Sequence, residues 1–126
     1  MKNMKSPLRR VKGLGSSHSG TGHFWHERVS SVALIPLTLW FGWAMLGLIN
    51  ASPVVAIGFL AHLHNALLMA GFIIVSLYHI KLGLQVIIDD YVHSPGMKIA
   101  LLLLTRAFVF GTGGISLFAL MRIASF

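Results

Sequence analysis

Three apolar stretches, each long enough to cross a lipid bilayer, constrain this chain more than any other feature. They cover residues 29–50, 65–88 and 99–121. A helix needs about 20 residues to cross the hydrocarbon core. Because backbone amides in hydrocarbon must be hydrogen-bonded within the protein, such stretches form helices. The sequence therefore predicts an all-α membrane protein with three transmembrane helices.

The composition agrees with this fold class. Of the 126 residues, 56% are hydrophobic and 10% are charged, and the mean hydropathy is +0.79. The formal charge of +7 does not indicate nucleic-acid binding, because five of the ten basic residues precede Gly13 and the others flank or interrupt the apolar stretches. The absence of cysteine excludes a disulfide, a thiolate metal site or an iron–sulfur cluster in this chain.

The chain divides into two parts. Residues 1–22 form a basic arm that lacks the apolar segment of a signal peptide, so we expect it to be retained. Residues 23–126 form one three-helix membrane domain. Within it, residues 52–64 are too short to span, and Pro53 at their start predicts a short interfacial helix.

The basic residues also predict the orientation, since loops rich in Lys and Arg stay inside. Six basic residues precede the first span, the loop over residues 51–64 has none, and the next loop carries Lys98. We therefore expect the N-terminus on the cytoplasmic or matrix side and the C-terminus outside. The end of the second span then lies on the inner side, like Arg28.

The second span carries the polar residues that cost most in hydrocarbon. On a helix, His79, Gly83 and Asp90 fall on one stripe, and Gly83 leaves room for a flat macrocycle or another backbone. The stripe suits a haem whose iron is bound by His79. A hydrogen bond from His79 to a neighbouring helix is the alternative. Since no other histidine is predicted within a span, a second axial histidine would come from another chain.

The inner end of this span suits a quinone. The phenol of Tyr91 can donate a hydrogen bond to a quinone carbonyl, and the carboxylate of Asp90 can hold structure or pass protons. Arg28, on the same side, can pair with haem propionates or orient the site. The alternatives are that Asp90 and Tyr91 merely end a span and that Arg28 is a positive-inside anchor.

Two further cations lie within the spans. Lys81 points away from the His79 stripe and is expected to extend its ammonium toward the inner interface. Arg106 enters the third span to a similar depth, and either does the same or pairs with Asp89 or Asp90. Polar groups on all three spans predict packing against helices of another chain.

Three other groups of residues are expected to be structural. The glycines of the third span allow close helix packing, the N-terminal histidines lie in a loop, and the tryptophans lie at interfaces or pack against other side chains. These groups are Gly111, Gly113 and Gly114; His18, His23 and His26; and Trp25, Trp40 and Trp43.

Together these residues resemble a known family, the smaller hydrophobic membrane-anchor subunits of succinate dehydrogenase (respiratory complex II), in the subgroup where two anchor chains share one b-type haem. The resemblance rests on His79, Gly83 four residues later, and Asp90-Tyr91 at eleven and twelve residues, together with Arg28 before the first span. It extends from about Ser19 to the end of the chain.

The resemblance implies that His79 is one axial ligand of haem b, that Gly83 packs against the haem, and that the companion anchor subunit supplies the other ligand. It implies that Tyr91 donates a hydrogen bond to ubiquinone, that Asp90 supports this site, and that Arg28 lies near the haem propionates or the quinone pocket. A flavoprotein subunit with FAD, where succinate is oxidised, and an iron–sulfur subunit would be the other partners. The location would be the bacterial or mitochondrial inner membrane.

Two other functions fit the same residues. One is the anchor of a fumarate reductase or another cytochrome b-type quinone protein, because the soluble partners and the quinone potential set the direction of the reaction. The other is a non-redox transporter or assembly protein, in which His79, Lys81 and Asp90 form a proton path.

Overall fold

The structure is a computed structural model that describes residues 7–8 and 18–125, with the side chains of residues 18–20 left out. Its main elements are four helices: α2 (His18–Leu48), α3 (Pro53–Ala61), α4 (Leu63–Tyr91) and α5 (Pro95–Ala124). The all-α fold class is confirmed. Three of the helices, over Thr21–Leu48, Leu63–Tyr91 and Pro95–Ala124, are long and apolar enough to cross a membrane.

α2 extends beyond the N-terminal end of the predicted first span. The first span was predicted from residue 29, but α2 starts at His18, so the prediction of a loop around His18, His23 and His26 is wrong. No proline lies between Pro7 and Pro36, and a helix does not need apolar residues to continue beyond hydrocarbon. The last part of the predicted arm is therefore the first turn of α2.

The short helix predicted between the first two spans is present as α3. Pro53 occupies its first turn, where the missing N–H costs nothing, and the Ser52 hydroxyl accepts a hydrogen bond from the Val55 N–H at 3.4 Å. The buried Asn65 side chain on α4 donates to the Phe59 carbonyl oxygen at 2.9 Å. This bond holds α3 against the start of α4.

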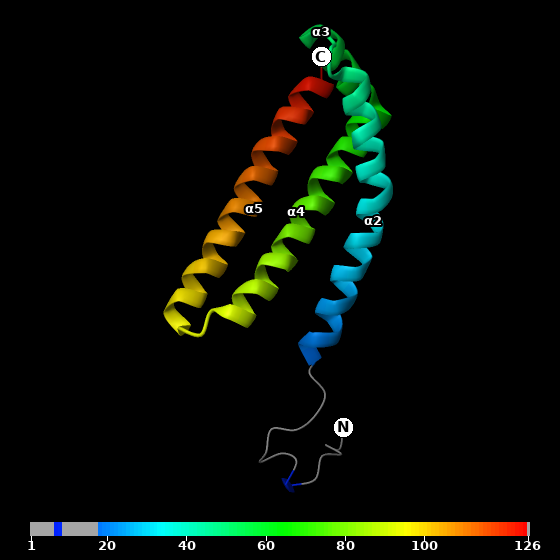
Figure 1. The fold of residues 1–126 in the computed structure, drawn as a ribbon. Coiled ribbons are helices and arrows are strands. Elements are labelled where there is room, and N and C mark those ends of the chain that lie inside the picture. The colour runs from blue at the N-terminus through cyan, green and yellow to red at the C-terminus, as the bar shows by residue number, and fades with distance from the viewer. Residues whose placement is uncertain (1–6, 9–17, 126) are drawn as a thin grey trace.

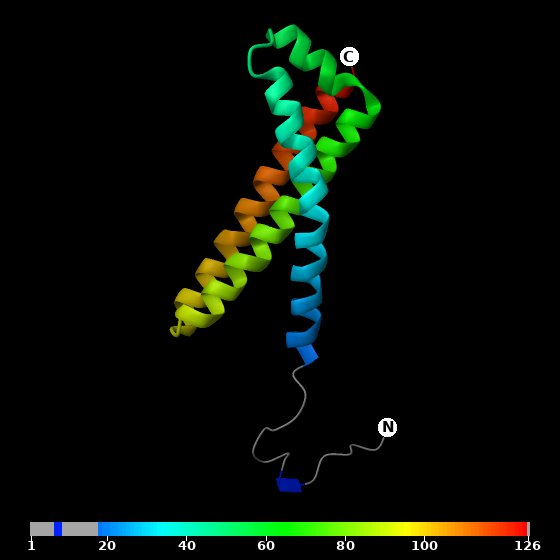
Figure 2. The same ribbon diagram turned by 45° about the vertical axis from the view of Figure 1, so that its right-hand side comes forward.

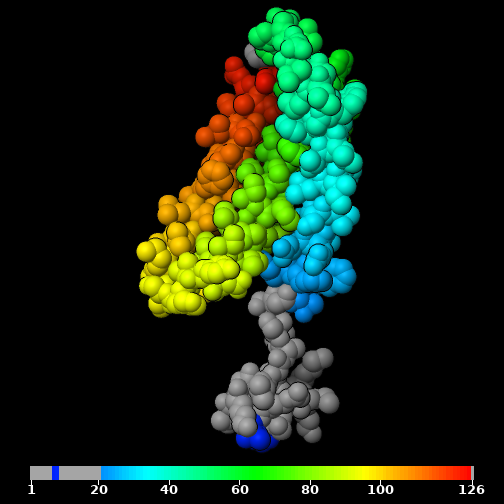
Figure 3. Space-filling model, viewed as in Figure 1, coloured from blue at the N-terminus to red at the C-terminus, as the bar shows by residue number. Residues whose placement is uncertain are grey.

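α4 is the central helix of the bundle. It runs antiparallel to α5 along its whole length, whereas α2 crosses α4 at an angle (Figures 1 and 2). The space-filling view shows side chains of α2 and α5 on either side of α4 (Figure 3). The start of α2 and the α4–α5 turn lie at one end of the bundle, and α3 and the end of α5 lie at the other.

Close contacts between the helices involve small residues and stacked rings. A Cβ added to Gly113 of α5 would lie 3.1 Å from Cδ1 of Leu77 on α4. The rings of Phe41 on α2 and Phe72 on α4 stack with centroids 4.5 Å apart. The predicted close packing is confirmed for Gly113, while a Cβ at Gly111 or Gly114 would meet no atom within 4 Å.

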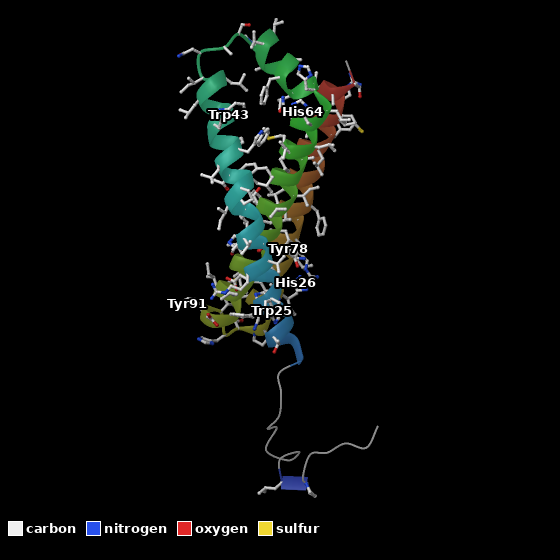
Figure 4. All side chains as sticks on the ribbon, turned by 90° about the vertical axis from the view of Figure 1, so that its right-hand side faces the viewer. Trp25, His26, Trp43, His64, Tyr78 and Tyr91 are labelled. Carbon is white, nitrogen blue, oxygen red and sulfur yellow. The ribbon has the colours of Figure 1, made fainter. Side chains whose placement is uncertain are left out.

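Few side chains of the described residues are buried by this chain alone. The buried apolar residues are Ala44, Ala66, Leu82, Ile88, Val109 and Leu120. Most large apolar side chains point outward, as expected of helices whose neighbours are lipid or the helices of another chain. Trp25 and Trp43 are exposed near opposite ends of α2 (Figure 4), while the Trp40 ring stacks on Phe59 with centroids 6.3 Å apart.

Candidate functional site

His79 lies on the face of α4 that packs against α2. Its Nδ1 is 2.9 Å from Oγ of Ser30, and the Ser30 side chain is buried, with 5% of the residue exposed. The interhelical hydrogen bond that sequence reasoning considered for His79 is therefore present. It engages only one of the two ring nitrogens, so it leaves the ligand role of the other open.

The second ring nitrogen of His79 is accessible from outside the chain. Nε2 of His79 has no hydrogen-bond partner among the described residues. Among these residues, the one side-chain nitrogen or oxygen that is both buried and without a partner is Nε2 of His23. Nε2 of His79 is therefore not enclosed by this chain. A neutral imidazole held through one nitrogen and open at the other has the form of a protein ligand to iron.

Gly83, one turn beyond His79, faces open space. Apart from its own helical turns, a Cβ built on this residue would meet no atom within 4 Å. Gly83 itself is thus not covered by a neighbouring side chain, and a flat group can approach the helix backbone at this residue. Nε2 of His79 and the backbone at Gly83 are thus both left uncovered by the surrounding side chains.

Arg28 lies on the other side of α2. Arg28 and Ser30 are two positions apart in the sequence, which places their side chains about 200° apart around the helix. Its guanidinium lies 5.0 Å from the centroid of the Phe24 ring, in cation–π contact, and the residue is exposed. The structure therefore does not bring Arg28 and His79 into contact within this chain.

The end of α4 presents Asp90 and Tyr91 to the surroundings. Tyr91 is 79% exposed, and neither side chain hydrogen-bonds within the part of the chain that the structure describes. Asp89 instead forms a salt bridge with Lys98 at 3.1 Å, across the turn into α5. Arg106 does not pair with Asp89, because it lies about two turns further along α5 than Lys98.

Lys81 points away from the His79 face, as predicted. Its side chain helps line an apolar cavity of about 380 Å³ between α4 and α5, together with Tyr78 and Gly113. The other lining residues are Ile74, Leu77, Val109, Phe110, Gly114 and Leu117. Lys81 and His79 therefore lie on different sides of α4, which makes a single proton path through both less favourable.

Sequence reasoning missed the surroundings of two polar residues of α2, Ser30 and His23. Ser30 is 49 positions from its partner His79, and such a pairing has no signature in local spacing. His23 was expected in a loop, but it lies on α2 with its Nε2 buried and unpaired among the described residues. One sequence signal could have indicated both residues: on a helix, the polar residues 23, 26, 27 and 30 share one face.

Comparisons with known proteins agree on one family. Residues 2–113 match the family model described as the succinate dehydrogenase/fumarate reductase transmembrane subunit. The succinate dehydrogenase hydrophobic membrane anchor subunit of Paracoccus denitrificans is 35% identical over 97 residues, which cover 77% of this chain and 75% of that protein. The corresponding subunit of Rickettsia bellii is 28% identical over 104 residues, covering 82% of this chain and 83% of the relative.

A membrane anchor subunit of succinate dehydrogenase from Reclinomonas americana is 30% identical over 92 residues, covering 70% of this chain and 76% of that protein. No solved structure matches the chain. The family match spans most of the chain, and the relatives agree with the three apolar helices in indicating a multi-pass membrane subunit. The chain therefore belongs to the succinate dehydrogenase/fumarate reductase transmembrane subunit family and, within it, to the hydrophobic membrane anchor subunits of succinate dehydrogenase.

Proposed function

We propose that this chain, together with a companion anchor subunit, forms a haem b site and a ubiquinone site in the succinate dehydrogenase complex. Its soluble partners would be a flavoprotein subunit with FAD, where succinate is oxidised, and an iron–sulfur subunit. The distribution of basic residues supports an orientation with the start of α2 and the α4–α5 turn on the inner side. Arg28, Asp90 and Tyr91 would then lie toward the soluble subunits.

The observation that carries the haem proposal is the state of His79. Its Nδ1 is occupied by Ser30, while Nε2 is open on a face where Gly83 leaves free space. A bound haem would supply a one-electron redox centre within the membrane. This chain would contribute Nε2 of His79 as one axial ligand and Gly83 as a contact surface, and the companion subunit would contribute the second ligand.

The quinone proposal rests on the exposed inner end of α4. Tyr91 offers a phenol donor and Asp90 a carboxylate, and neither is used within the described part of this chain. Asp90 lies eleven residues from His79, about 16 Å along the helix axis. Tyr91 would donate a hydrogen bond to a ubiquinone carbonyl, and Asp90 would support the site. The rest of the pocket would come from partner subunits.

Arg28 would act from the outward face of α2. Its guanidinium is exposed beside an open depression lined by Trp25, Val29 and Val32. A cation here can pair with an anionic group held between this chain and a partner, and haem propionates are such groups. The separation of Arg28 from the His79 face means that the partner chain must complete this part of the site.

Optical spectroscopy of the purified complex tests the haem proposal. The wild-type complex should show b-type bands on reduction with dithionite, and His79→Leu should remove or shift them. His64→Leu is the matched control, because His64 lies on the same helix but is exposed near its outer end (Figure 4). Unchanged bands in His79→Leu would show that iron is bound elsewhere. The chains that co-purify with the complex test the proposed partners.

A further inference from the structure

We propose that Ser30 is a positioning residue for His79. Its hydroxyl oxygen accepts a hydrogen bond from the Nδ1–H of His79 and so fixes the tautomer in which the Nε2 lone pair is free to bind haem iron. This inference rests on the proposed haem ligation and extends it to a residue of α2.

The direction of the hydrogen bond follows from the position of the single hydroxyl proton. Oγ of Ser30 lies 2.9 Å from the Glu27 carbonyl oxygen and 2.9 Å from Nδ1 of His79. A carbonyl oxygen can only accept, so the hydroxyl donates to Glu27. If it donated to Nδ1 instead, two oxygen lone pairs would face each other at 2.9 Å. Nδ1 must therefore carry the proton that lies between His79 and Ser30.

The tautomer decides whether His79 can act as a ligand. A neutral imidazole has one ring proton, and with that proton on Nδ1 the lone pair is on Nε2. Nε2 is the nitrogen that the chain leaves open. The opposite tautomer would place the lone pair against Ser30 and an N–H toward the haem side, where it could not bind iron. Ser30 thus selects the form that can bind.

Burial makes this selection effective. Ser30 is buried, and its hydroxyl is tied to the backbone of its own helix through Glu27, so the acceptor position is fixed. A second hydrogen bond, between Tyr78 and His26, joins the same helices one turn away. The His79 ring therefore has a defined orientation before any ligand arrives. Partners of this kind in metal sites raise the basicity of the ligand nitrogen and keep the ring aligned.

The test compares Ser30→Thr with Ser30→Val in the assembled complex. The two side chains have nearly the same shape, but only threonine keeps the hydroxyl. Ser31→Ala is the matched control, because the Ser31 hydroxyl donates to the same Glu27 carbonyl at 2.8 Å without contacting His79. The measurements are haem content per complex, haem affinity on reconstitution, and the haem midpoint potential from a spectroscopic redox titration.

Ser30→Thr and Ser31→Ala should keep the wild-type potential and haem content. Ser30→Val should raise the midpoint potential, because a less basic imidazole stabilises ferric iron less, and should weaken haem binding about 10- to 100-fold. If Ser30→Val gives no haem-containing complex while Ser30→Thr is normal, the requirement for the hydroxyl is also supported. Equal potentials and affinities in Ser30→Val and Ser30→Thr would overturn the role of Ser30 but not the proposed haem function. Absence of b-type bands in the wild-type complex would overturn the proposed haem function and this inference together.

Discussion

The phenol oxygen of Tyr78 lies 2.8 Å from Nδ1 of His26, one helical turn before Ser30 on α2 (Figure 4). Because Tyr78 and His79 are consecutive on α4, two neighbouring hydrogen bonds join α2 to α4 at this level. In a membrane the hydrophobic effect does not drive helices together, so packing and polar contacts hold them. This pair of bonds fixes the position of the His79 ring relative to α2.

The Tyr78–His26 bond should contribute measurably to the packing of α2 on α4. Tyr78→Phe removes only the phenol oxygen, and His26→Ala removes the partner. A double-mutant cycle on the free energy of unfolding in detergent should give a coupling of about 0.6 kcal/mol, typical of interhelical hydrogen bonds in membrane proteins. Strictly additive effects of the two substitutions would show that the hydrogen bond does not stabilise the bundle.

Gly113 should tolerate a large side chain poorly. A Cβ at this position would lie 3.1 Å from Cδ1 of Leu77, so Gly113→Leu forces α4 and α5 apart or displaces Leu77. We expect a loss of about 1–3 kcal/mol in unfolding free energy, with a lower yield of assembled complex. Leu77→Ala introduced together with Gly113→Leu should restore part of the loss.

Gly111→Leu is the control for this prediction. Gly111 lies on the same helix, is exposed, and would place its Cβ within 4 Å of no atom of the chain. Replacing an exposed helical glycine gains helix propensity, so this variant should be neutral or slightly more stable. Equal stability of the Gly113 and Gly111 variants would contradict the close approach of α4 and α5.

The sequence alone predicts most of the fold because hydrocarbon leaves few options for the backbone. Three long apolar stretches can only become three helices, and Pro53 marks the start of the short one. The predicted span begins at residue 29 because hydropathy reports where hydrocarbon begins, whereas the helix α2 continues back to His18. Outside hydrocarbon, a helix can continue through polar residues as long as its backbone hydrogen bonds are made, so hydropathy does not mark its first residue.

The candidate site could be predicted only as far as one helix extends. The stripe through His79, Gly83 and Asp90 follows from helical geometry within α4. The partner of His79 lies on another helix, and neither the crossing angle of α2 nor its rotation can be derived from spacing along the chain. Asp89 illustrates the same limit, since its partner proved to be Lys98 and not Arg106. Contacts between helices depend on packing that a single sequence does not display.

Asn65 should hold α3 in place at the end of the bundle opposite the start of α2. The residue is only 7% exposed, and its side-chain amide donates to the Phe59 carbonyl oxygen. Asn65→Leu should leave this carbonyl without its donor and cost about 1–3 kcal/mol locally. Hydrogen–deuterium exchange measured by mass spectrometry should then increase over residues 53–62. Asn50→Leu, at an exposed position of the preceding loop, should leave exchange in this segment unchanged. Equal exchange in both variants would argue against a role of the Asn65–Phe59 hydrogen bond in holding α3.

Tyr91 should matter for quinone reduction and not for haem binding. The chain has two tyrosines, both on α4, which gives a natural control. The Tyr78 hydroxyl is paired with His26, whereas Tyr91 is 79% exposed and available to a ligand held with a partner subunit. Tyr91→Phe would remove the proposed hydrogen bond to ubiquinone, worth about 0.5–1.5 kcal/mol, and should lower kcat/KM for quinone about 2- to 10-fold.

The measurement compares succinate:quinone reductase activity with succinate oxidation by an artificial acceptor that bypasses the membrane subunits. Tyr91→Phe should lower only the first activity and should keep the reduced haem spectrum, because Tyr91 lies about 18 Å along the helix axis from His79. Tyr78→Phe should keep the quinone reductase activity. If Tyr91→Phe retained the wild-type kcat/KM for quinone, the phenol would not be a quinone ligand. A parallel loss of both activities would instead indicate that the variant impairs assembly of the complex, since the acceptor reaction needs no contact with Tyr91.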